Sequence, residues 1–199
     1  VQFELPEMRL PTIPKTLSEV GAATASFGHG LSVSPLHMVT ATGALANGGN
    51  YIAPTLYKRT QAQAEPLYER VVSQQTSDQV RYLMRLNALE GSGSQMNKAA
   101  LGYRVGGKTG TAEKVINGRY SSGTVTNFFA SAFPLDNPRY ALVIVVDEPK
   151  AENPQSGTTA GWNAGHVTGR VVQRVAPMLG VAPDFAEALD RDLVPAVLR

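Results

Sequence analysis

Residues 102–111 read GYRVGGKTGT, and two unrelated chemistries fit this stretch. From Gly102 it matches G-x-x-x-x-G-K-[ST], a loop that holds nucleotide phosphates at the start of a helix. From Lys108 it matches K-T-G, a motif of serine acyl-transfer enzymes that requires a strand. The secondary structure that follows Lys108 therefore decides both the fold and the chemistry.

The phosphate-loop hypothesis has a second support in residues 142–148, LVIVVDE, which imitate a buried strand ending in a magnesium-binding Asp. Such a loop runs straight into a helix, whose N-terminal amides meet the phosphate. Here Gly110 and then Asn117-Gly118 follow Thr109, and this composition predicts a hairpin and no helix. A nucleotide-binding NTPase is therefore the weaker hypothesis, which a helix beginning at Thr109 would revive.

The composition predicts one globular unit and names no partner. The chain has 199 residues, of which 43% are hydrophobic and 17% charged, enough for a buried core. Its net charge of +2 is too small to predict binding to nucleic acid. It contains no cysteine, which excludes disulfides and thiolate catalysis, and its longest apolar run, residues 140–146, is too short to cross a bilayer.

Helices are predicted before Gly102. The stretch SPLHMVTATGALANGG places Ser34 as a helix N-cap and Pro35 in the first turn. A second helix is expected from Thr76, as the first residue of a capping box, to Gly91. Residues 91–98 are expected to form a loop.

The ends of the chain and one intervening segment carry weaker signals. Prolines keep residues 1–15 from forming a helix, which predicts an extended lead-in. Residues 50–59 are expected to form an edge strand, because Pro54 removes a backbone donor. Residues 167–178 carry valines and a methionine at helical spacing, which predicts a C-terminal helix, and residues 181–199 are expected to be a tail.

A meander of antiparallel strands is predicted after Gly102. Residues 108–116 and 119–129 are joined by Asn117-Gly118, the strongest short hairpin signal. Residues 126–134 and 140–149 form a second antiparallel pair. Helices, then a meander, then a helix predict an α+β fold in which helices cover an antiparallel sheet.

On a strand, each residue of K-T-G acquires a role. Lys108 offers a compact positive charge, and Thr109 and Thr111 present hydroxyls on one face to bind a carboxylate. Gly110, which lacks a side chain, allows an acyl group to approach the backbone. A backbone N–H near Thr111 is expected to point at a developing oxyanion, while the strand edge pairs with an extended peptide.

Three longer stretches around this motif resemble one known family in the same order. They read FGHGLSVSPLHMVTATGALANGG (27–49), GYRVGGKTGTAEKVINGRY (102–120) and NFFASAFPLDNPRYALVIVVDEPKA (127–151). Over roughly residues 15–180 the chain resembles the C-terminal half of the transpeptidase domain of class B penicillin-binding proteins, the monofunctional D,D-transpeptidases of the bacterial cell wall. The resemblance implies a partial β-lactamase/transpeptidase-like fold, with residues 1–199 forming the C-terminal portion of a single domain.

The resemblance also implies an activity and a site. Family members attack the D-Ala-D-Ala end of a peptidoglycan stem peptide with a serine, release D-Ala and pass the acyl group to an amine, and β-lactams acylate the same serine. At the matching positions, Lys108 and Thr111 are the expected catalytic residues. Thr109, Gly110 and Thr111 are expected to bind substrate, and His29 is a weaker candidate for lining the site. The reaction implies no cofactor and no metal.

Family members work in the cell envelope, so the resemblance predicts a location and partners. The expected place is the periplasmic side of the inner membrane, with an N-terminal anchor absent from this sequence. Expected partners are peptidoglycan stem peptides, β-lactam antibiotics, a membrane glycosyltransferase and other cell-wall synthesis proteins, and no nucleic acid.

The chain departs from the family in lacking two motifs. The family's nucleophile lies in Ser-x-x-Lys and its second motif is Ser-x-Asn, and neither pattern occurs here. We therefore expect both to lie upstream, and expect this chain alone to be inactive. A D,D-carboxypeptidase or a penicillin sensor of the same superfamily, and a non-enzymatic binding module, remain open alternatives.

Other conspicuous residues are expected to be structural. Ser34 and His37 resemble a nucleophile and base, but Ser34 fits better as a helix cap. Asp147 and Glu148 are expected in a solvated turn or a structural ion pair, and Trp162 is expected to be packing surface. The histidines lack the spacing of a metal site.

Overall fold

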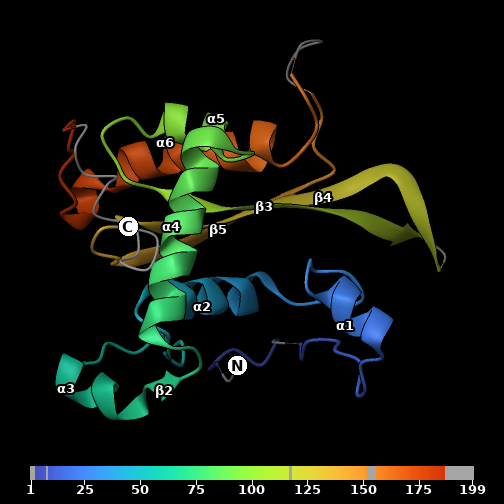
Figure 1. Ribbon diagram of the computed structural model, residues 1–199, viewed down its shortest axis with the longest axis horizontal. Helices are drawn as coiled ribbons and strands as arrows, with labels where there is room; N and C mark the ends of the chain where they lie inside the picture. The colour runs from blue at the N-terminus through green and yellow to red at the C-terminus, as the bar shows by residue number, and fades with distance from the viewer. Residues whose placement is uncertain (1–2, 8, 117, 152–155, 187–199) are drawn as a thin grey trace.

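The computed structural model describes residues 3–7, 9–116, 118–151 and 156–186 (Figure 1). The elements in chain order are α1 (Glu19–Ala25), α2 (Pro35–Ala46), β1 (Asn50–Tyr51), α3 (Gln61–Ala64), η1 (Glu65–Leu67), β2 (Glu69–Arg70), α4 (Gln74–Glu90), α5 (Ser94–Ala99), β3 (Gly106–Ile116), β4 (Arg119–Phe133), β5 (Tyr140–Asp147), η2 (Gly161–Gly165), α6 (His166–Val175) and η3 (Pro177–Leu179).

A three-stranded antiparallel sheet in the order β3-β4-β5 forms the centre of the molecule. Helix α2 lies on one face of the sheet, and α5 and α6 lie on the other (Figure 1). Helix α4 contacts α2, β3 and α5, and so runs from one layer to the other. The predicted α+β fold, an antiparallel sheet covered by helices, is confirmed.

Strands β3 and β4 form the long hairpin that the sequence predicts. Ile116 pairs with Arg119, so only positions 117 and 118 lie between the strands. Gly118 has a φ of 78°, as a tight hairpin turn requires, whereas Asn117 lies outside the described residues. Because Thr109 lies within an antiparallel strand and no helix begins there, the phosphate-loop hypothesis is wrong.

The two faces of the sheet pack against different clusters. On the α6 side, Phe129 is fully buried with Met96 and Val172. On the α2 side, Ala132 packs with Leu135 and with residues of α2 and α4. Side chains alternate along a strand, so this division assigns every residue of β3 to one face or the other.

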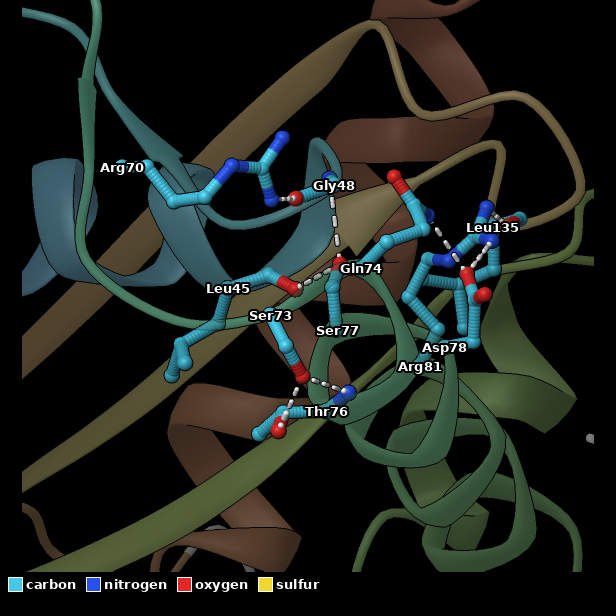
Figure 2. Close-up of polar contacts among 10 residues, drawn as sticks. All are labelled: Leu45, Gly48, Arg70, Ser73, Gln74, Thr76, Ser77, Asp78, Arg81 and Leu135. Atoms are coloured by element: carbon cyan, nitrogen blue, oxygen red, sulfur yellow. Dashed lines mark hydrogen bonds and ion pairs between the residues drawn. The ribbon is translucent and has the colours of Figure 1, made fainter.

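The junction between α2 and α4 depends on a fully buried serine (Figure 2). The Ser77 Oγ atom donates a hydrogen bond of 2.6 Å to the carbonyl of Leu45 and accepts one of 3.0 Å from the Gly48 N–H. Arg70 donates to the Gly48 carbonyl over 2.9 Å. These bonds satisfy backbone groups at the C-terminal end of α2, which no intrahelical partner serves.

Two predictions before Gly102 are wrong in detail. Helix α4 begins one turn earlier than predicted, because Ser73 and not Thr76 caps it: the Ser73 Oγ atom accepts from the Thr76 N–H over 3.0 Å. Residues 91–98 are not a loop throughout, since Ser94–Ala99 forms α5. Its Met96 is fully buried, so tertiary packing outweighs the loop composition.

The predictions for the chain ends and for residues 50–59 were confirmed only in part. The predicted edge strand over 50–59 shrinks to Asn50–Tyr51, and α1 (Glu19–Ala25) had not been predicted. The described part of residues 1–15 contains no helix, as expected. The C-terminal helix is confirmed, but Met178 at the end of the predicted apolar line is 84% exposed, and Val172 is the valine that is fully buried.

An ion cluster joins the three strands near the ends of β3 and β5. The Lys114 Nζ atom lies 2.7 Å from Asp147 Oδ2 and 2.8 Å from Glu148 Oε1, and Thr126 donates to Asp147 over 2.6 Å. The bonds from Lys114 and Thr126 lower the pKa of Asp147, and the bonds to Asp147 and Glu148 raise the pKa of Lys114. The structural ion pair expected for Asp147 and Glu148 is confirmed.

No helix within the described residues combines the length and the apolar character that a membrane crossing requires.

Replacing Ser77 with Ala removes the hydrogen-bond partner of the buried Gly48 N–H and of the part-buried Leu45 carbonyl. We expect the free energy of unfolding to fall by about 1–3 kcal/mol, the usual cost of an unsatisfied buried polar group. Urea denaturation measures the difference. A matched control is Ser73→Ala at the exposed cap of the same helix, which should cost about 1 kcal/mol. A loss in Ser77→Ala smaller than that in Ser73→Ala would contradict the role of Ser77 at the junction.

Replacing Lys114 with Met should destabilise the protein only within a pH window. The contribution of Asp147 is present above its unfolded pKa of about 3.9 and is lost as pH falls through its lowered folded pKa. The contribution of Lys114 is present below about pH 10.4 and is lost as pH rises through its raised folded pKa. Urea midpoints of the two proteins should differ at pH 7, converge near pH 2 and converge again in 1 M salt, because the groups are exposed. A difference that persists at acid pH would show that Lys114 acts by packing.

Candidate active site

The outer edge of β3 carries exposed backbone groups. Within the described residues β3 pairs with β4 alone, so its other edge has no neighbouring strand. The Gly107 carbonyl accepts a bond of 2.8 Å from Asn87 Nδ2, and the Thr109 carbonyl accepts one of 2.8 Å from Lys108 Nζ. Alternate residues of an antiparallel strand direct both N–H and C=O to the same side. Gly107, Thr109 and Thr111 therefore direct their backbone groups away from β4.

The Lys108 ammonium lies at this edge and is exposed to solvent. Besides its bond to the Thr109 carbonyl, Nζ lies 3.3 Å from Thr109 Oγ1. A positive charge and a hydroxyl thus stand side by side where the strand meets solvent. This pairing suits a carboxylate, which accepts hydrogen bonds from both kinds of donor.

Thr109 and Thr111 line a cleft of about 230 Å³ on the α6 side of the sheet. The residues that line the cleft with them come from the loop before α5, from α5, and from the start of η2: Ser92, Ser94, Gln95, Thr159, Ala160, Gly161 and Trp162. The lining is rich in hydroxyl groups and contains no charged side chain. Lys108 at the strand edge therefore supplies the positive charge nearest to these hydroxyls.

Glycines allow neighbouring elements to approach closely around the motif. On the face of β3 opposite to the cleft, a Cβ atom on Gly110 would lie 1.9 Å from the Phe128 ring of the neighbouring strand, so a larger residue would have to displace that ring. A Cβ atom on Gly161 would lie 2.5 Å from the Ser92 carbonyl oxygen. The start of η2 can therefore rest against the loop that precedes α5.

A chain of hydrogen bonds links the motif to α4. Ser92 Oγ lies 2.9 Å from Thr109 Oγ1 and donates to Asn87 Oδ1 over 3.1 Å. Asn87 Oδ1 also accepts the Ser92 N–H over 3.1 Å. Neither Ser92 nor Asn87 was assigned a role from the sequence. The sequence signal that could have identified Asn87 is a side-chain amide on the apolar side of α4, since a polar group in that position needs hydrogen-bond partners.

The structure does not bring His29 to the cleft. Its ring lies 5.9 Å from that of Tyr120, which pairs with Val115 near the hairpin end. Val115 is seven positions from Lys108 along the strand, a separation of about 20 Å. His29 therefore belongs with the hairpin tip in this structure, and the cleft consists of other residues.

Ser34 and Trp162 were both expected to be structural. Ser34 caps α2, and its hydroxyl lies 2.6 Å from His37 Nδ1. Trp162 is 48% exposed and forms part of the cleft wall. Among the described residues no group of three or more His, Asp or Glu side chains is placed to hold a metal ion.

Comparison with known proteins matches this chain to one family. The model of the penicillin binding protein transpeptidase domain matches residues 4–168. "Probable peptidoglycan D,D-transpeptidase FtsI" of Caulobacter vibrioides is 39% identical over 188 residues, which cover 90% of this chain and 32% of that protein. Stage V sporulation protein D of Bacillus subtilis is 37% identical over 173 residues, covering 82% of this chain and 26% of that one. The chain thus spans about a third or less of these two relatives.

Solved structures show the same likeness. The transpeptidase domain of Burkholderia pseudomallei penicillin-binding protein 3 superposes with a TM-score of 0.80 at 30% identity, covering 93% of this chain and 55% of that one. Penicillin-binding protein 3 of Mycobacterium tuberculosis, solved in complex with ampicillin, gives a TM-score of 0.73 at 26% identity, covering 93% and 44%. The family model, the curated relatives and the shared fold agree, and this chain belongs to the penicillin-binding protein transpeptidase family.

Proposed function

We propose that this chain forms one wall of the active site of a peptidoglycan D,D-transpeptidase, which cross-links stem peptides by serine acyl transfer. The observation that carries the proposal is the Lys108 ammonium, 3.3 Å from the Thr109 hydroxyl at the open edge of β3. Membership of the family supports the reaction. So does the name of the Caulobacter relative, a peptidoglycan D,D-transpeptidase.

In this proposal the substrate's terminal carboxylate binds at Lys108 and Thr109. Lys108 attracts the anion, and Thr109 and Thr111 donate hydroxyl hydrogen bonds that fix its orientation. The cleft has no carboxylate among its lining residues, so nothing there repels the substrate's charge. A peptide that ends in D-Ala-D-Ala presents its carboxylate one residue beyond the reacting carbonyl, so an anchored terminus positions that carbonyl.

The backbone of Thr111 is proposed to stabilise the oxyanion. The alternation of β3 directs the Thr111 N–H away from β4, toward the side on which a peptide can pair with the strand edge. A backbone donor held in a sheet is already oriented before the reaction, so it stabilises a developing negative charge without reorganisation. Gly110 adds no side chain of its own to the backbone beside this donor, and the Phe128 ring packs against it on the face opposite to the cleft.

The nucleophile is proposed to lie outside these 199 residues, because neither Ser-x-x-Lys nor Ser-x-Asn occurs in the sequence. The serine oxygen would attack the carbonyl carbon of the penultimate D-Ala and lose its proton to a base. The C–N bond then breaks, the leaving D-Ala takes up a proton, and an amine of a second peptide displaces the serine. Lys108 would tune the proton transfers by its charge.

The same proposal assigns partners and a place. β-Lactams would acylate the serine in place of the stem peptide, as the ampicillin complex of the Mycobacterium tuberculosis protein suggests. Cell-wall synthesis places the reaction in the bacterial envelope, on the periplasmic side of the inner membrane, with a membrane glycosyltransferase as an expected partner.

Covalent labelling tests the proposal directly. We expect a fluorescent penicillin to label the full-length product of the gene and not the 199-residue chain, with intact mass reporting one acyl adduct. The chain alone should not react, because it lacks the proposed serine. Labelling of the 199-residue chain would place a nucleophile within it, and failure of both proteins to react would refute the transpeptidase function.

Replacing Lys108 with Met in the full-length protein should slow acylation by penicillin roughly 10- to 150-fold, the loss of a hydrogen bond to a charged group. Lys108→Arg should restore little of this rate, because a planar guanidinium does not place its charge like an ammonium. Stopped-flow acylation rates check both variants, with Lys98→Met on the exposed end of α5 as a matched control. Unchanged acylation in Lys108→Met would remove Lys108 from the site.

A further inference from the structure

The hydrogen bonds around Thr109 allow two arrangements of the hydroxyl protons. Asn87 Nδ2 donates to the Gly107 carbonyl, which fixes the amide so that Oδ1 is its acceptor. Asn87 Oδ1 receives the Ser92 hydroxyl proton over 3.1 Å. Ser92 Oγ lies 2.9 Å from Thr109 Oγ1, and either hydroxyl can be the donor at this contact. When the single Ser92 proton is on Asn87, Ser92 Oγ accepts the Thr109 proton. In this arrangement Thr109 Oγ1 also faces the Lys108 ammonium.

This arrangement conflicts with the role of Thr109 in carboxylate binding. A carboxylate only accepts hydrogen bonds, so Thr109 must turn its proton toward the substrate to bind it. That turn breaks the bond to Ser92 and leaves Ser92 Oγ facing the oxygen of Thr109. Ser92 removes this conflict if it turns its own proton toward Thr109 Oγ1, as the 2.9 Å contact permits.

We propose that Ser92 is a positioning residue that switches from acceptor to donor when an anionic ligand binds to Thr109. In the free site Ser92 holds the Thr109 proton. On binding, Thr109 donates to the ligand's carboxylate, and Ser92 rotates its proton from Asn87 Oδ1 to Thr109 Oγ1. Donation to Thr109 strengthens Thr109 as a donor in turn, since hydrogen bonds in a chain polarise one another. This inference rests on the proposed function.

The surroundings of Ser92 permit the switch at little cost. When the Ser92 hydroxyl leaves Asn87, Oδ1 keeps the hydrogen bond from the Ser92 N–H over 3.1 Å, so the amide oxygen is not left without a partner. The backbone of the loop is held by two further bonds, from the Gly91 N–H and the Gly93 N–H to the Asn87 carbonyl. Only the hydroxyl has to move, while the loop stays in place against Gly161.

Acylation rates of the full-length protein with benzylpenicillin and with its methyl ester test the inference. We expect Ser92→Ala to slow acylation by the acid about five- to tenfold, the loss of one hydrogen bond, and to leave the rate with the uncharged ester unchanged. Ser92→Thr, which keeps the hydroxyl, should restore the rate with the acid, because the backbone at position 92 has an ordinary negative φ. The loss should appear in the binding constant for the acid more than in the maximal acylation rate.

A double-mutant cycle separates action through Thr109 from a general effect on the cleft. Ser92→Ala should have no effect in a Thr109→Val background, because the group through which it acts is gone. Ser94→Ala serves as the matched control in the same wall, and its effect, whatever its size, should add to that of Thr109→Val. Additive effects of Ser92 and Thr109, or equal losses with the acid and the ester, would overturn the inference. Failure of the unmodified protein to react would instead refute the proposed function on which the inference depends.

Discussion

The pairing of β3 with β4 is the constraint on which the rest of the structure depends. This register sets Lys108 opposite Ala130 and Thr109 opposite Phe129, and so decides which residues of the motif face α6 and which face α2. It also decides which carbonyls and N–H groups point outward. A slip of one residue would exchange the two faces and bury the hydroxyls that line the cleft.

The open edge that results is stabilised in an unusual way. Edge strands invite uncontrolled pairing, and proteins commonly protect them with charge or cover. Here Asn87 of α4 binds the Gly107 carbonyl, and Lys108 covers the carbonyl of Thr109 with its own ammonium. The same groups that protect the edge are the ones proposed to receive the substrate. A ligand would therefore replace contacts that already exist rather than fill an unsatisfied site.

Local chemistry accounts for the parts of the fold that the sequence predicts. The hairpin follows from Asn117-Gly118 between two alternating runs, and the start of α2 follows from Ser34 before Pro35. Helix α5 escapes prediction because its six residues form a helix through the burial of Met96, and flanking glycines hide that signal. The cap of α4 escapes because Ser73 and Thr76 are both suitable caps, three residues apart.

The site likewise combines residues that the sequence predicts with residues that only the folded structure brings together. Lys108, Thr109 and Thr111 are adjacent in sequence, so their arrangement on a strand is predictable, while Ser92 meets Thr109 only because α4 and α5 fold against β3. The contact between Gly110 and the Phe128 ring lies on the face of the sheet opposite to the cleft, because side chains alternate along β3. A larger side chain at position 110 would have to displace this ring, and the displacement would reach the hydroxyls of Thr109 and Thr111 only through the strand backbone. The motif glycine thus couples the packing on one face of the sheet to the shape of the cleft on the other.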